Sequence, residues 1–138
     1  MGGAESATGY VNPINSRQVF FSDIGAYQMP EKYSPNWKWS GLPTSVWPNE
    51  SYYAMEHSQM VWSPICYEIV YIGNGNKLMK SYNNGASYET IYTAPNVNDE
   101  VEWIEISRSN PDVIYITTRN NSLGEGLVYK SINGGKSF

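Results

Sequence analysis

The chain has 138 residues, which is enough for one domain of ordinary size, and its formal net charge is −4. Its nine Lys and Arg residues are scattered along the sequence, which argues against a nucleic-acid-binding surface. No stretch approaches the roughly 18 consecutive apolar residues of a membrane span, and a single Cys excludes an internal disulfide.

The N-terminal part predicts a leader followed by strands. Residues 1–8 are mostly small and predict a flexible leader in which no basic and apolar signal-peptide regions are visible. Gln18–Ser22 is a short run typical of a strand. Trp and polar residues alternate over Trp37–Gly41, which predicts a strand with one aromatic face.

The rest of the chain predicts further short strands separated by turns. Tyr52–Trp62 is ambiguous between helix and strand, and we favour a strand for its second half. Glu68–Ile72 and Val113–Thr117 are β-branched runs of the buried-strand type. In Trp103–Ser107, Ile104 and Ile106 share one face of a predicted strand. Gly, Asn and Pro residues mark loops at 73–76, 94–102, 109–112 and 120–126.

Two similar nine-residue stretches, Lys80–Tyr88 and Lys130–Phe138, stand 50 residues apart. Both read Lys-Ser-x-Asn-x-Gly-x-Ser-aromatic. An Asn side chain can bond backbone amides further along a turn, and Gly adopts positive φ without steric cost. Each stretch therefore predicts a tight hairpin between two strands. Two copies are much stronger evidence of a repeat than one.

These stretches resemble Asp-box (bacterial neuraminidase) repeats, whose pattern is Ser-x-Asp-x-Gly-x-Thr-Trp or Phe. Asn replaces the family's Asp here and keeps the carbonyl acceptor that the turn needs. In the family the boxes are structural hairpins on the blades of β-propellers and are not catalytic. The resemblance implies the same structural role for the box residues Ser81, Asn83, Gly85, Ser87, Tyr88, Ser131, Asn133, Gly135, Ser137 and Phe138.

The repeats and the strand pattern together predict an all-β fold, a partial β-propeller of about two to three four-stranded antiparallel blades with Asp-box hairpins. We expect one domain over residues 9–138, with blade-like units at about 9–47, 48–95 and 96–138, the last of them incomplete. A closed propeller has about 4–8 blades, so we expect the chain to be a fragment whose partners include the remaining blades. A small β-sandwich is the rival interpretation.

The segment from Gly9 to Met29 resembles the first blade of the xyloglucan-active family of Asp-box glycoside hydrolases. There an Asp in a Thr-Asp-Ile-Gly-Gly-Ala-Tyr-Arg-Trp type motif is one of two catalytic carboxylates. Ser22, Asp23, Ile24 and Gly25 match the first four positions, and Ala26, Tyr27 and Gln28 follow after one missing Gly. The resemblance makes Asp23 a candidate catalytic residue. The alternative is a turn residue that bonds nearby backbone amides.

Several aromatic side chains are candidates for contact with sugar rings, because aromatic faces suit the C–H faces of pyranoses. The predicted substrate-binding residues are Tyr27, Trp47, Tyr52 and Tyr53. Trp37 and Trp39 fit packing between blades better. His57 is the only His, which argues against a His-based metal site. We expect no metal and no cofactor.

Two functions stay open at the level of sequence. We favour a non-catalytic Asp-box propeller segment, like those of sortilin-type proteins, that binds a polysaccharide, another glycan or a peptide ligand. The alternative is part of a glycoside hydrolase that acts on a β-glucan such as xyloglucan, although this chain holds no complete catalytic pair. The family resemblance implies a secreted or cell-surface protein, and neither nucleic acid nor a membrane span is expected.

Overall fold

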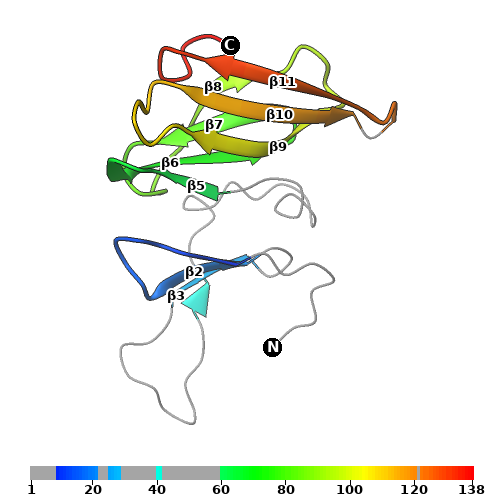
Figure 1. Cartoon of the computed structure of the whole chain (residues 1–138). Coiled ribbons are helices and arrows are strands. Elements are labelled where there is room, and N and C mark those ends of the chain that lie inside the picture. Colours follow the sequence, from blue (N-terminus) through cyan, green and yellow to red (C-terminus); the bar gives the residue numbers. More distant parts are fainter. Residues whose placement is uncertain (1–8, 22–24, 29–39, 42–59, 121) are drawn as a thin grey trace.

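The computed structural model describes residues 9–21, 25–28, 40–41, 60–120 and 122–138 (Figure 1). The described residues form eleven strands and no helix. All strand pairs are antiparallel, and they build three small sheets that follow one another along the chain. The prediction of an all-β antiparallel fold is therefore confirmed.

The first sheet, sheet A, contains β1 (Gly9–Val11), β2 (Gln18–Phe21), β3 (Gly25–Gln28) and β4 (Ser40–Gly41) in that spatial order. The turn between β1 and β2 is built on Asn12, which is buried. Its Oδ1 accepts hydrogen bonds from the backbone N–H groups of Ile14 and Asn15 at 2.9 and 3.2 Å. A side chain that bonds the backbone two residues on is the usual reason for Asn in a turn.

The second sheet, sheet B, contains β5 (Met60–Ser63), β6 (Cys66–Asn74), β7 (Lys77–Ser81) and β8 (Glu89–Thr93) in sequence order. The strand predicted at 68–72 lies within β6, and the strand predicted for the second half of 52–62 overlaps β5. β6 continues through Gly73 and Asn74, which we expected in a turn, because these residues pair with Leu78 and Lys77 of β7. The turn is confined to Gly75 and Asn76.

The third sheet, sheet C, contains β9 (Asp99–Ile106), β10 (Ile114–Asn120) and β11 (Glu125–Ser131), with β10 in the middle. β9 begins inside the stretch that we expected to be a loop. Asp99 is buried there, and its Oδ1 accepts a hydrogen bond of 2.8 Å from Nδ2 of Asn120 at the end of β10. This bond joins residues far apart in sequence, which explains why local patterning does not predict the start of β9.

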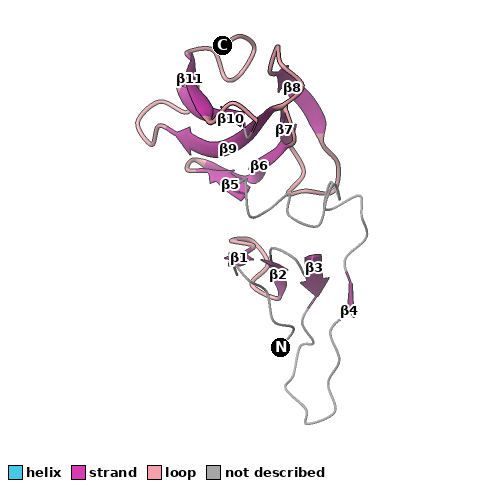
Figure 2. Cartoon of the chain, turned by 90° about the vertical axis from the view of Figure 1, so that its right-hand side faces the viewer, coloured by secondary structure: helices cyan, strands magenta, loops and turns pink. Residues whose placement is uncertain are grey.

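Sheets B and C pack face to face, as Figures 1 and 2 show. The side chains between them form the largest apolar cluster of the described residues. Its buried members are Tyr71 and Leu78 from sheet B and Val101, Ile104, Ile106, Ile114 and Ile116 from sheet C. Ile104 and Ile106 share the buried face of β9, as their alternation predicts, whereas Trp103 on the opposite face is 53% exposed.

The other face of sheet B also carries apolar side chains. Met60, Val70 and Ile72 form a second buried cluster, and Tyr10 of β1 and Tyr88 pack against it. Sheet B is therefore apolar on both faces, as its continuous β-branched run Glu68–Ile72 predicts. Tyr10 connects this cluster to sheet A.

Candidate functional site

The first Asp-box-like hairpin connects β7 to β8 and is held by side-chain hydrogen bonds. The Ser81 hydroxyl donates to Oδ1 of Asn83 at 2.9 Å and accepts from the backbone N–H groups of Asn83 and Gly85 at 3.2 and 2.8 Å. Oδ1 of Asn83 also accepts from the N–H of Ser87 at 2.9 Å, and Nδ2 of Asn83 donates to the Ser87 hydroxyl at 2.9 Å. Three side chains thus close the turn.

The second hairpin, which follows β11, repeats this network bond for bond. The Ser131 hydroxyl donates to Oδ1 of Asn133 at 2.9 Å and accepts from the N–H groups of Asn133 and Gly135 at 3.3 and 2.9 Å. Asn133 bonds the N–H and the hydroxyl of Ser137 at 3.0 and 2.8 Å. The shared sequence pattern therefore corresponds to a shared hydrogen-bond geometry.

The Asn side chain performs two tasks in this turn. Its carbonyl oxygen accepts backbone and hydroxyl donors, as a carboxylate would, and its amide donates to the outer Ser. A carboxylate at this place would accept from the outer hydroxyl instead, because a hydroxyl can donate or accept. The hairpin geometry is therefore compatible with either Asn or Asp.

Both hairpins need backbone conformations with positive φ at their centre. Asn84 and Gly85 have φ values of 53° and 86°, and Gly134 and Gly135 have 70° and 89°. Each hairpin is also tied to the backbone near the start of the second strand of its own sheet, in β6 for the first hairpin and in the turn just before β10 for the second. The N–H of Asn84 donates to the carbonyl of Glu68 at 2.7 Å, and the N–H of Gly134 donates to the carbonyl of Asp112 at 2.9 Å.

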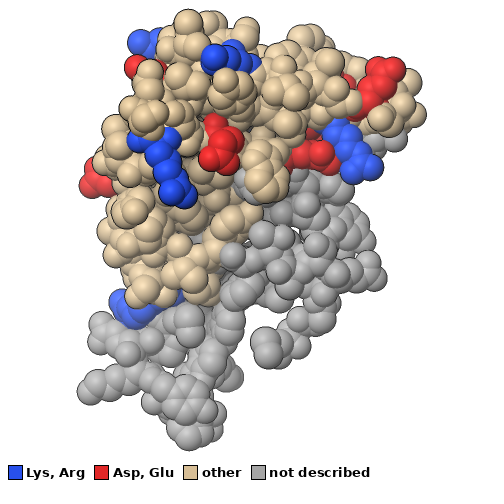
Figure 3. Space-filling model, in the orientation of Figure 1, with Lys and Arg blue, Asp and Glu red and all other residues tan. Residues whose placement is uncertain are grey.

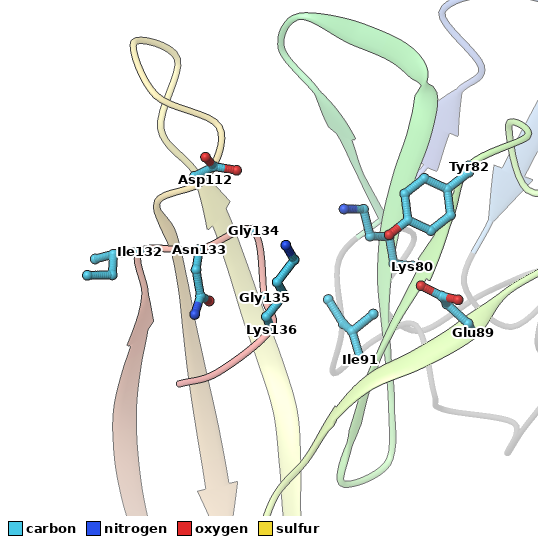
Figure 4. Close-up of a pocket in the computed structure, with 10 residues that line it drawn as sticks. All are labelled: Lys80, Tyr82, Glu89, Ile91, Asp112, Ile132, Asn133, Gly134, Gly135 and Lys136. Carbon is cyan, nitrogen blue, oxygen red and sulfur yellow. The ribbon is translucent and has the colours of Figure 1, made fainter.

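A groove of about 540 Å³ lies between sheet B and the second hairpin (Figure 4). One wall comes from the β7–β8 arm and presents Lys80, Tyr82, Glu89 and Ile91. The opposite wall comes from the turn before β10 and from the second hairpin. It contributes Asp112, Ile132, Asn133, Gly134, Gly135 and Lys136. The groove thus exists because the hairpin that follows β11 of sheet C lies beside β7 and β8 of sheet B.

Lys80 is the most buried charged group of the groove, with 8% of its surface exposed. Its Nζ lies 5.1 Å from the ring centre of Tyr71 and 4.6 Å from that of Tyr82, within the range of cation–π attraction. Burial lowers the pKa of Lys80, and the carboxylates of Glu89 and Asp112 act in the opposite direction. The ammonium group of Lys80 therefore lies near two ring faces, near Glu89 on its own wall and near Asp112 on the opposite wall.

Tyr82 gives the groove an accessible aromatic ring, because 55% of its surface is exposed. Partial burial raises the pKa of Tyr82, and the nearby carboxylate of Glu89 acts in the same direction. Lys136 extends from the opposite hairpin, so that ammonium, carboxylate, hydroxyl and ring groups line one groove (Figure 4). This set of groups offers hydrogen bonds and an apolar platform.

Most residues predicted from sequence to contact a substrate lie outside the described part of the chain. They are Asp23, Trp47, Tyr52 and Tyr53. Trp37 and Trp39, which were predicted to pack between blades, also lie outside the described residues. Tyr27 lies in β3, where its Cα pairs with those of Val19 and Gly41. The catalytic role of Asp23 and the sugar-binding roles of these aromatic residues stay predictions.

Sequence reasoning did not find the groove itself. Of its lining residues, Asn133 and Gly135 were predicted only as members of a hairpin, and Lys80 only as the first residue of the repeated pattern. The shared spacing of the two hairpins was the available signal, since it places them at equivalent positions of neighbouring sheets. The packing of those sheets is a long-range feature that local patterns do not contain.

The described surface has no strong charge pattern in the view of Figure 3. Lys, Arg, Asp and Glu side chains are scattered there among uncharged residues, and Arg119 and Glu102 form an ion pair at 3.3 Å. Within the ranges that the structure describes, no group of three or more His, Cys, Asp or Glu side chains is placed to hold a metal ion. The same ranges contain no helix long and apolar enough to span a membrane.

Comparisons with known proteins give little guidance for this chain. No protein-family model matches the sequence, and no curated protein matches it. Among solved structures, the fold is similar to a GH74 xyloglucanase from Xanthomonas campestris, with a TM-score of 0.40 and 11% sequence identity. That match covers 91% of this chain and 28% of the xyloglucanase chain. A likeness of this size assigns neither a fold family nor an activity.

Proposed function

We propose that the chain is a non-catalytic segment of an Asp-box β-propeller from a larger secreted or surface protein, and that the groove between its hairpins binds a ligand, in the first place a glycan. The propeller units would be residues 9–47, 48–95 and 96–138, preceded by a leader at 1–8. The observation that carries the proposal is the pair of identically bonded hairpins at equivalent places of two face-packed sheets, with a polar and aromatic groove between them.

The equivalence of the two sheets supports the propeller. In sheet B, Val70 pairs with Ser81 and Tyr71 with Lys80, and in sheet C, Ile114 pairs with Ser131 and Tyr115 with Lys130. The corresponding residues Val70 and Ile114 each point toward the preceding sheet. Val70 belongs to the cluster against which Tyr10 of sheet A packs, and Ile114 belongs to the cluster between sheets B and C. Repeated antiparallel sheets that each pack on their predecessor are the building principle of propellers.

The hydrogen bonding of the hairpins supports a structural role for their repeated side chains. Ser81 and Asn83, like Ser131 and Asn133, each form several bonds within their own turns. Such side chains contribute stability to the turn. Binding therefore falls to the groove residues around them, chiefly Tyr82 with its exposed ring.

The groove chemistry suits a glycan. The ring of Tyr82 can contact the C–H face of a pyranose, and Lys80, Lys136 and Asp112 can form charge-assisted hydrogen bonds with sugar hydroxyls. The cavity of about 540 Å³ lies within the roughly 300–1,000 Å³ range of small-molecule sites. A peptide ligand would use the same charged groups.

The test is a calorimetric titration of the chain with a panel of oligosaccharides that includes xyloglucan fragments. Tyr82→Ala should weaken binding about tenfold, which corresponds to about 1.4 kcal/mol. Tyr67→Ala is the matched control, because Tyr67 is 51% exposed and lies outside the groove. Sugar binding that Tyr82→Ala and Tyr67→Ala weaken equally would contradict the assignment of the groove. Release of reducing ends during the titration would contradict the non-catalytic role.

A further inference from the structure

Two lysine ammonium groups converge in the groove between sheet B and the second hairpin. Lys80 extends from β7 on one wall and Lys136 from the second hairpin on the other, and both nitrogen atoms point into the space between the walls (Figure 4). Burial lowers the pKa of Lys80, and the charge of Lys136 lowers it further, so the two ammonium groups repel each other. A negative charge placed between them would be attracted by both.

Neither ammonium group is neutralised within the part of the chain that the structure describes. Only 8% of the surface of Lys80 is exposed, and its Nζ contacts the ring faces of Tyr71 and Tyr82. Among the described residues, no carboxylate oxygen lies within ion-pair distance of Nζ of Lys80 or Lys136, and neither atom forms a hydrogen bond. A lysine is seldom buried without a partner, and its ammonium group has three N–H donors. The groove therefore offers a ligand positive charge and unused donors.

The carboxylates of the groove limit how much negative charge a ligand can carry. Glu89 lies on the wall of Lys80 and Asp112 on the wall of Lys136, and both side chains are exposed. Both are near enough to Lys80 to oppose the lowering of its pKa by burial. They would repel a ligand with several negative charges, such as an acidic peptide. Because carboxylates accept hydrogen bonds, they favour a ligand that surrounds one anionic group with hydroxyl donors.

We propose that the groove recognises an acidic sugar, a hexuronic acid residue whose carboxylate lies between Lys80 and Lys136. The inference rests on the proposed glycan-binding function and specifies its ligand. The carboxylate forms charge-assisted hydrogen bonds with the two ammonium groups, which are stronger than hydrogen bonds between neutral groups. The sugar hydroxyls donate to Glu89 and Asp112. The exposed ring of Tyr82 contacts the C–H face of the sugar.

The experiment compares two disaccharides that differ in one group. Cellobiouronic acid carries a carboxylate where cellobiose carries a hydroxymethyl group, so the ratio of their affinities for the full 138-residue chain measures recognition of the carboxylate. Both affinities are measured by calorimetry at neutral pH and low ionic strength. We expect cellobiouronic acid to bind at least about tenfold more tightly. The preference should shrink at about 0.5 M salt, because salt screens exposed charges.

Variants of the chain locate the carboxylate. Lys136→Gln keeps a polar side chain and removes one ammonium group, so it should lower the affinity for cellobiouronic acid about tenfold and that for cellobiose much less. Lys77→Gln is the matched control and should leave the ratio unchanged, because Lys77 is an exposed residue of β7 that does not line the groove. Lys80→Gln should act like Lys136→Gln. Urea unfolding of Lys80→Gln is recorded alongside, since Lys80 is buried.

The outcomes separate this inference from the proposed function. Equal binding of the two disaccharides would overturn the uronate inference while glycan binding stands, as would an equal effect of Lys136→Gln and Lys77→Gln on their ratio. Tighter binding of a triglutamate peptide than of cellobiouronic acid would also overturn it, because the groove would then take an acidic peptide. If the folded chain binds no sugar of the oligosaccharide panel, the proposed function fails together with the inference.

Discussion

Gly135 offers the sharpest test of how the second hairpin is attached to sheet B. Its φ of +89° lies in a region that residues with a side chain rarely adopt. A Cβ at this position would stand 2.6 Å from Cδ1 of Ile91 in β8, and 3.7 Å from Cδ1 of Ile114. The substitution Gly135→Ala therefore strains the backbone and also pushes against the neighbouring sheet.

The two costs can be estimated separately. Positive φ in a residue with a Cβ costs about 1–2 kcal/mol. Displacing the end of the Ile91 side chain adds about 1–2 kcal/mol, within the range for overpacking. We expect Gly135→Ala to lower the free energy of unfolding by about 2–4 kcal/mol. Gly124→Ala is the matched control: Gly124 has a φ of +68°, and no atom lies within 4 Å of the place its Cβ would take, so that only the backbone cost of about 1–2 kcal/mol applies.

The assay is urea unfolding followed by Trp fluorescence and near-UV circular dichroism. A double-mutant cycle with Ile91→Val, which removes Cδ1, should show a coupling energy of about 1 kcal/mol that favours the double variant. If Gly135→Ala is no more destabilising than Gly124→Ala, and the cycle shows no coupling, the hairpin does not press against β8 and the packing argument is wrong.

The remaining predictions concern the hairpin network, alkaline stability and the glycosidase alternative. Asn83→Asp should change stability by less than about 0.5 kcal/mol, whereas Asn83→Leu should cost about 1–3 kcal/mol because it removes the bonds of Asn83 to Ser81 and Ser87, each worth about 0.5–1.5 kcal/mol; urea unfolding of both variants measures the difference. Burial raises the pKa of Tyr71 and of Tyr92 from 10 to about 12, so the folded state retains protons that the unfolded chain loses, and stability should fall as the pH rises from 10 to 12. The lowered pKa of Lys80 makes stability rise with pH up to the ordinary Lys pKa of 10.5, and so partly offsets this decline. Tyr71→Phe removes one of the two Tyr groups and should flatten the decline, which unfolding experiments at each pH would measure. If the glycosidase interpretation holds for the parent protein, Asp23→Asn should abolish xyloglucan hydrolysis without unfolding it; full turnover by the folded variant would exclude a catalytic Asp23.

Local sequence patterns predicted those parts of the fold that depend on neighbouring residues. The hairpins follow from Ser, Asn and Gly at fixed offsets, and the buried face of β9 follows from the alternation of Ile104 and Ile106. In both cases the residues that specify the structure lie within a few positions of one another, so the sequence contains the whole signal.

Features that depend on distant residues were not predictable in the same way. β9 starts at Asp99 because Asn120 of the neighbouring strand binds its carboxylate. The groove arises because sheet C places Gly135 and Lys136 beside Lys80 and Tyr82 of sheet B. A single sequence shows that these residues are present but does not show which of them meet.

The anchoring of each hairpin at or just before the second strand of its own sheet has a consequence for how such units vary in length. Asn84 is bonded to Glu68 and Gly134 to Asp112, so the hairpin end of each strand pair is fixed. The far tip of that pair differs between the sheets: it is a two-residue turn at Gly75 and Asn76 in sheet B and a longer loop before Glu125 in sheet C. Additions at this tip leave the hairpin register unchanged, which makes the loop around Gly124 the natural place for inserted sequence, in evolution or in a tagged variant.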